Sequence, residues 1–224
     1  GRPLYLWLYT GLTTGHKPQV PMFPAPMADH YGPLMRKYSK SGVKGIFFNG
    51  IPQETDAYFL FKLTDDPFQD TEKLMDDYFT RMYGPKAGPT LKEFYKFAES
   101  IYANPRNYPQ GAKGPELYYG TLGTGPRMRK LSQLVKQAEE QLADAPEIWK
   151  KRFAVFKLGT WEYMRQGRES YEKSKVAKAS SSIAVACPVD MLKPDISASG
   201  EIDWRDAQSF GGFNGWLKDS GDIS

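Results

Sequence analysis

The sequence predicts an α/β fold in which a single strand–helix–strand unit precedes a long helical region. Two apolar, aromatic runs, residues 4–9 and 43–48, are typical of buried strands. One helical pattern lies between them, and a crossover through a single helix favours parallel pairing of the two strands. From residue 52 to residue 175, apolar side chains recur at the three- and four-residue spacing of amphipathic helices.

The connection between the two strands is predicted to be a proline-rich loop followed by one helix. The loop spans residues 10–26, and its four prolines hold it extended and deny it ladder hydrogen bonds. Long ordered loops of this kind are usually functional. Asp29 is suited to cap the helix, which carries apolar side chains on one face and ends at Ser41-Gly42.

Five further helices are predicted after the second strand. Asp70 is suited to cap the second of them, which ends at Gly84-Pro85, and Pro89 is suited to open the third. A connector rich in Gly, Pro and Tyr separates the third from the fourth, and the break at residues 144–146 makes the last two an antiparallel pair. The predicted ranges are 54–63, 70–83, 89–104, 127–144 and 147–174.

At both ends of the chain, the sequence is typical of strands whose partner strands are not in this sequence. The run at residues 4–9 is typical of a strand with neighbours on both sides, and the residues before it are too few to supply one. Residues 199–224 carry aromatic turn and strand signals without a partner strand. We therefore expect the chain to be joined to the remainder of a longer protein.

Composition argues against several classes of protein. The chain has 224 residues, with 30 Lys and Arg against 26 Asp and Glu, and the basic residues are scattered, so no nucleic-acid partner is expected. Cys187 is the only cysteine, which excludes an intrachain disulfide and favours a small buried hydrophobe over a catalytic thiol. Because no apolar run reaches about 18 residues, no membrane span is expected.

Aromatic and polar side chains stand where the two strands end. Aromatic residues make up 14% of the chain, and aromatic rings stack on the apolar C–H face of sugars. Trp7 and Tyr9 share one face of the first strand, and Asn49 ends the second, where its amide needs hydrogen-bond partners. His16 lies in the proline-rich loop, and Glu54 is a candidate acid, base or hydroxyl acceptor. Because parallel strands end at one edge, Tyr9, His16, Asn49 and Glu54 are expected to converge on a sugar ring above Trp7.

These residues also have structural interpretations, which stay open at this point. Trp7 and Tyr9, together with Tyr5, would fill the interior behind the sheet. His16 would be an ordinary surface residue, and Glu54 would be a charge favoured by the dipole of the helix that it begins.

Other acidic pairs are predicted to lie outside the functional site. Asp65-Asp66 precedes a proline and is typical of a turn, and Asp76-Asp77 lies on the solvated face of a helix. The sequence has no phosphate-binding glycine loop and no cluster with the spacing of metal ligands, so neither a cofactor nor a metal is expected.

Several segments resemble a known family. After the aromatic strand, proline-rich loop and helix come residues 41–50 (SGVKGIFFNG), then residues 75–87 (MDDYFTRMYGPKA) and FYKF at 94–97. This order resembles the C-terminal half of a bacterial domain of unknown function related to the family 163 glycoside hydrolases. The Tyr-Gly-Pro-x-Ala element is its most specific part, and the resemblance covers residues 3–175. Residues 200–207, followed by Phe213, resemble the opening strands of a family 9 type carbohydrate-binding module.

The resemblance implies a chain of four parts, beginning with the C-terminal part of a (β/α) barrel. Residues 1–63 would be the last strands and helices of the barrel, and residues 64–175 a helical region packed on it. Residues 176–198 would be a linker, and residues 199–224 the beginning of a β-sandwich module.

The resemblance also implies a carbohydrate-active protein, part of a glycoside hydrolase acting on glycans that contain N-acetylhexosamine. In the hydrolase members the N-acetyl group of the substrate is the nucleophile, and the acidic pair would lie on an earlier strand, upstream of Gly1. The hydrolases tend to carry an acidic residue near the final barrel strand, where this chain has Asn49. No catalytic residue is therefore assigned here. The implied ligand is a glycan and the implied location is secreted, periplasmic or cell-surface; the alternative is a non-catalytic glycan-binding or scaffold protein.

Overall fold

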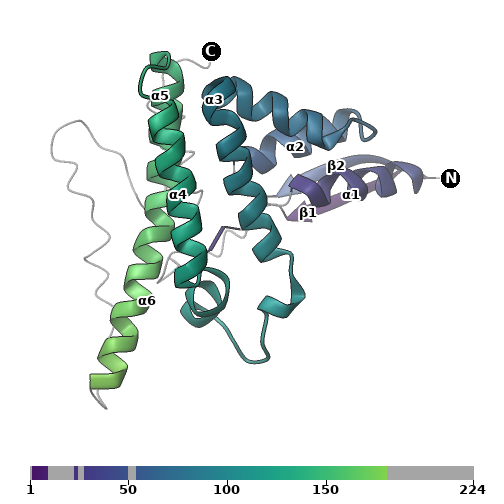
Figure 1. Ribbon diagram of the computed structural model, residues 1–224. Coiled ribbons are helices and arrows are strands. Elements are labelled where there is room, and N and C mark those ends of the chain that lie inside the picture. The colour runs from purple at the N-terminus through teal and green to yellow at the C-terminus, as the bar shows by residue number, and fades with distance from the viewer. Residues whose placement is uncertain (1, 10–22, 25–27, 50–53, 181–224) are drawn as a thin grey trace, which may run out of the picture.

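The computed structural model describes residues 2–9, 23–24, 28–49 and 54–180 (Figure 1). A small sheet and two helices form one end of this part of the chain, and longer helices form the rest. The coarse α/β prediction is confirmed by this arrangement. The described residues contain a sheet of two strands, and the predicted sandwich at 199–224 lies outside them.

The two predicted strands pair in parallel, as their short crossover requires. β1 (Leu4–Tyr9) lies beside β2 (Val43–Asn49), and α1 (Ala28–Lys40) connects them. In the register, Trp7 is opposite Phe47 and Tyr9 is opposite Asn49. Gly42 makes the turn into β2 with a φ of 82°, a conformation in which a residue without Cβ is favoured.

The two faces of this strand pair have different environments. Leu8, Ile46 and Phe48 point to the helices and pack against the buried core. On the opposite face, the side chains of Trp7 and Phe47 are 61% and 57% exposed. The prediction of fully buried strands is therefore wrong for this face, because the described helices pack on only one side of the sheet.

The helix α3 (Thr71–Tyr102) folds back on itself at Gly84. Glu72 and Lys96 form an ion pair although 24 residues separate them. In a straight helix they would lie about 36 Å apart. The backbone of Gly84 is non-helical, with φ 81° and ψ 169°, and Pro85 begins the second half. The predicted break is confirmed, but helix resumes at Pro85 and not at Pro89, because proline is well accommodated at a first helical position.

Two aspartate side chains fix the start of this helical hairpin by accepting backbone hydrogen bonds. Asp70 caps α3 by accepting hydrogen bonds from the backbone N–H groups of Glu72 and Lys73, at 3.0 and 3.3 Å. α2 (Glu54–Asp65) comes before it, and Asp66 accepts a hydrogen bond from the N–H of Phe68 at 3.0 Å in the turn between the two helices. The predicted turn at Asp65-Asp66 is thus confirmed.

The remaining helices pack around the second half of α3. A short 3₁₀ turn (Pro105–Asn107) and a π-helix (Glu116–Leu122) lie in the predicted connector, before α4 (Gly125–Gln141). α5 (Glu147–Phe156), a π-helix (Lys157–Glu162) and α6 (Tyr163–Ser180) then run antiparallel to α4 (Figure 1). The antiparallel pair is confirmed. Its second member is interrupted by the π-helix and continues into the first residues of the predicted linker.

Most of the aromatic residues of this helical part are core residues. Phe79, Tyr83, Phe94 and Phe156 are each at most 3% exposed. The rings of Phe94 and Phe156 meet edge to face, with their centroids 5.1 Å apart. Most of the aromatic side chains in the helical part therefore pack the core. None of the helices in the described part of the chain is long and apolar enough to cross a bilayer.

The turn at Gly84 provides a test of this architecture. A Cβ at Gly84 would lie 2.5 Å from the indole of Trp149, and the backbone there is in a region open almost only to glycine. We expect Gly84→Ala to lower the free energy of unfolding by about 3 kcal/mol, from backbone strain and overpacking together. Urea denaturation measures this. The matched control is Gly42→Ala, where φ is also positive but an added Cβ meets nothing within 4 Å; equal losses in both variants would contradict the prediction.

Candidate functional site

The carboxyl ends of β1 and β2 meet at one edge of the sheet. Tyr9 and Asn49 are the last residues of their strands, and the register places them opposite each other. Two of the predicted site residues therefore reach the same edge. Their contact with one sugar ring stays a prediction, and His16 lies outside the described residues.

Beside this edge, the exposed face of the sheet carries an aromatic platform made by Tyr5, Trp7 and Phe47. The rings of Trp7 and Phe47 are 4.6 Å apart between centroids, and the ring of Tyr5 lies over Gly45, where an added Cβ would be 2.9 Å from it. Because side chains alternate along a strand, Tyr5 and Trp7 lie on one face of β1, beside Phe47 of β2. The platform is thus an exposed apolar surface on two adjacent strands, with the rings of Trp7 and Phe47 tilted by 54° to each other.

Glu54, the fifth predicted site residue, is held against α3. It is the first residue of α2, and its carboxylate accepts a hydrogen bond from the hydroxyl of Tyr78 at 2.9 Å. Burial raises the pKa of the Glu54 carboxyl, while the Tyr78 hydroxyl and the charge of Arg152 act in the opposite direction. A fixed carboxyl with a raised pKa is suited to proton transfer. The same contact also satisfies a buried tyrosine hydroxyl, which is a structural role.

Two further carboxyl groups, both buried, were not among the predicted site residues. Asp56 is 4% exposed and Glu99 is 7% exposed. The hydroxyl of Tyr31 forms a hydrogen bond with Asp56. Each acid had a usable signal in the sequence, because each lies on the apolar stripe of its own helix: Asp56 with Phe59, Leu60 and Leu63, and Glu99 with Leu91 and Tyr95.

Glu99 joins α3 to the beginning of α1. Its carboxylate accepts hydrogen bonds from the backbone N–H of Asp29, at 3.0 Å, and of His30. The first N–H groups of a helix have no partner within the helix, so this carboxylate completes the start of α1 from another element. Burial, with the nearby charges of Asp29 and Asp56, raises the pKa of Glu99 to about 7, against the lowering effect of the two N–H groups.

These three carboxyl groups are all bound to the protein itself. Glu54 binds the Tyr78 hydroxyl, Asp56 interacts with Tyr31, and Glu99 binds the start of α1. They position α1, α2 and α3 around the edge. Among the residues that the structure describes, no group of three or more His, Cys, Asp or Glu side chains is arranged to hold a metal ion.

Asp76 and Asp77 lie on the surface, as the sequence predicted. Asp76 pairs with Lys92 at 2.6 Å, and Asp77 pairs with Arg81 at 2.6 Å while also accepting a hydrogen bond from Tyr58. The side chains of Asp76 and Asp77 are 67% and 43% exposed. Their roles are therefore electrostatic and structural.

Part of the chain is similar to a known family. Residues 3–96 match the model of a family described as a domain of unknown function (DUF4838). The matched segment contains the strand pair, the aromatic platform and Glu54, and it ends within α3 before Glu99. No curated protein and no solved structure matches the chain.

The raised pKa of Glu99 predicts a specific dependence of stability on pH. In the unfolded chain this group ionises near its usual pKa of about 4.5, and in the folded protein near 7. Protonation of Glu99 therefore stabilises the folded protein. This contribution to the free energy of unfolding is fully present below about pH 4.5 and is lost as the pH rises through 7. We expect Glu99→Gln, which keeps an oxygen acceptor for the α1 N–H groups, to be more stable than the wild type by about 3 kcal/mol at pH 8.

The measurement is urea denaturation between pH 4 and pH 8. The matched control is Glu93→Gln on the same helix, where the carboxylate is 55% exposed and pairs with Lys130 at 3.2 Å. Parallel stability curves for the wild type and Glu99→Gln across this range would contradict the role of Glu99.

Proposed function

We propose that this chain is part of a carbohydrate-active protein and that the aromatic platform and the carboxyl edge contact the glycan. The glycan class that we assign contains N-acetylhexosamine, in keeping with the resemblance to the family 163 glycoside hydrolases. A secreted, periplasmic or cell-surface location goes with such a ligand.

The observation that carries the proposal is the exposure of the aromatic platform next to the carboxyl edge. Trp7 and Phe47 are 61% and 57% exposed and already packed against each other, so a ligand would meet a preformed surface. A pyranose ring has an apolar C–H face that packs on such rings, while its hydroxyl groups need polar partners. Exposed apolar patches bounded by polar residues are characteristic of ligand sites.

Polar partners would come from the carboxyl edge. Asn49 is the last residue of β2, two positions after Phe47, and an amide has both donors and an acceptor for sugar hydroxyl groups. Tyr9, opposite Asn49, carries a hydroxyl with the same double capacity. In this proposal His16 and Glu54 are further contacts on the segments that follow the strands, and Trp7 is the floor.

Non-catalytic glycan binding is the second candidate, and the state of the carboxyl groups favours it. Glycosidases use two carboxyl groups that face one glycosidic bond. Glu54, Asp56 and Glu99 each bind a group of the protein instead, and Asp56 and Glu99 are buried. We therefore assign glycan contact to this chain and no catalytic acid to its described residues.

Binding of an N-acetylglucosamine oligosaccharide tests the platform. We expect Trp7→Ala to raise the dissociation constant for N,N′-diacetylchitobiose about fivefold, because stacking on one aromatic ring contributes about 1 kcal/mol. Isothermal titration calorimetry measures this. The matched control is Phe68→Ala, since Phe68 is 59% exposed and lies in the turn between α2 and α3, outside the aromatic platform. Unchanged affinity in Trp7→Ala, or an equal loss in Phe68→Ala, would remove the platform from the proposal.

The chain of residues 1–224 is expected to be inactive on aryl N-acetylglucosaminides. The reason is that Glu54, the described carboxyl group nearest in sequence to the carboxyl edge, already binds the Tyr78 hydroxyl. Release of the aryl group, followed by absorbance, measures the reaction. Turnover that disappears in Glu54→Gln would overturn the expectation and make Glu54 catalytic.

A further inference from the structure

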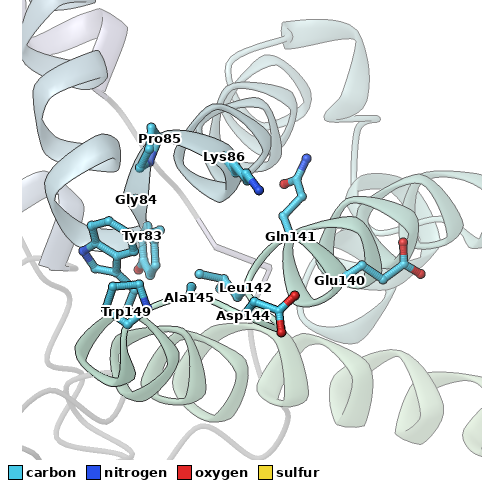
Figure 2. Close-up of a pocket in the computed structure, with 11 residues that line it drawn as sticks. Tyr83, Gly84, Pro85, Lys86, Glu140, Gln141, Leu142, Asp144, Ala145 and Trp149 are labelled. Carbon is cyan, nitrogen blue, oxygen red and sulfur yellow. The ribbon is translucent and has the colours of Figure 1, made fainter.

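A second candidate site lies at the turn of α3, away from the sheet. We name it the kink cavity; its volume is about 470 Å³, within the range typical of small-molecule sites. Its walls are the turn of α3, the end of α4 and the start of α5, so it shares no residue with the aromatic platform (Figure 2). The lining residues are Tyr83, Gly84, Pro85, Lys86, Glu140, Gln141, Leu142, Asp144, Ala145, Pro146 and Trp149.

The kink cavity is preformed by contacts between its walls. The indole of Trp149 packs directly on Gly84, and Arg152, one turn further along α5, donates a hydrogen bond to the carbonyl of Arg81 at 2.7 Å. On the side of α4, the hydroxyl of Thr90 donates to Oε1 of Gln141 at 2.8 Å, which orients the Gln141 amide. A preformed site loses little conformational entropy when a ligand binds.

The lining combines an apolar floor with free polar groups. Tyr83 and Leu142 are buried, and Trp149 is half-buried, so part of its indole faces the cavity. Figure 2 shows Tyr83 and Trp149 on one side, with Gln141 and Asp144 on the other and Lys86 above them. Within the described part of the chain, the side chains of Lys86 and Asp144 form no ion pair or hydrogen bond with other side chains.

The charges of the lining select the chemistry of the ligand. Lys86 is positive, whereas Glu140 and Asp144 are negative. All three side chains are exposed, so they lie at the mouth of the kink cavity and the apolar floor lies below them. A neutral polyhydroxylated ligand fits this mixture of charges, because hydroxyl groups both donate to carboxylates and accept from an ammonium group.

We propose that the kink cavity binds a neutral saccharide, with one sugar ring packed on Trp149 and its hydroxyl groups hydrogen-bonded to Asp144, Lys86 and Gln141. This inference rests on the proposed function and extends it, since it adds a second glycan contact on the helical region. Neither contact requires the other for its geometry.

The test follows the indole N–H signals of Trp7 and Trp149 by NMR while ¹⁵N-labelled chain of residues 1–224 is titrated with N,N′-diacetylchitobiose and, separately, cellobiose. A saturable shift of the Trp149 signal with at least one of the two sugars is expected. A shift of Trp7 alone would overturn the kink cavity and leave the proposed function standing. Shifts in neither signal would overturn both proposals, and a shift of Trp149 alone would overturn only the platform.

Two variants test whether Asp144 binds the sugar. Asp144→Asn is expected to raise the dissociation constant measured from the Trp149 signal about tenfold, because the variant loses a hydrogen bond to a charged group. Asp144 is exposed, so this variant keeps the fold even where Trp149→Ala would loosen the turn at Gly84. The matched control is Glu147→Gln, an exposed carboxylate of the first turn of α5 outside the lining. Equal affinity in Asp144→Asn and Glu147→Gln would overturn the proposed binding mode.

Discussion

The packing of α5 on the turn of α3 is the constraint on which the rest of this structure depends. Trp149 covers Gly84, and Arg152 binds the carbonyl of Arg81 at the end of the first half of α3. This turn brings both halves of α3 together, to the point where a Cβ at Gly88 would lie 2.8 Å from the carbonyl oxygen of Phe79. With this turn in place, one half of α3 contacts α2 through Tyr78 and the other contacts α1 through Glu99.

Two carboxyl groups connect the two halves of α3 to the helices next to the sheet. Glu99 completes the start of α1, and Glu54 accepts a hydrogen bond from the hydroxyl of Tyr78, so both α1 and α2 are bound to one helical hairpin. Burial raises the pKa of both acids, which shows that their surroundings disfavour charge. Acids in such positions hold elements together at the expense of stability near neutral pH. This arrangement is why we place glycan contact on the aromatic platform instead.

Aromatic residues have two distinct uses in this chain. In the helical part, rings such as Phe94 and Phe156 are buried and pack edge to face. On the sheet, Trp7 and Phe47 are exposed and packed on each other, and Trp149 is shared between packing on Gly84 and lining the kink cavity. Composition alone does not separate these uses, because an aromatic ring offers the same apolar surface to a core and to a sugar.

The sequence by itself determined the features that depend on neighbouring residues. Two apolar runs and a short crossover predicted the parallel pair and placed Tyr9 and Asn49 at one edge. The side chain of Asp70 predicted a cap, and the backbone freedom of Gly84 predicted a turn. Only the tertiary structure decided which surfaces are covered. The exposure of Trp7, the binding of Glu99 to the start of α1 and the contact between Trp149 and Gly84 each depend on residues distant in sequence, and no local pattern encodes which helix will pack on which face.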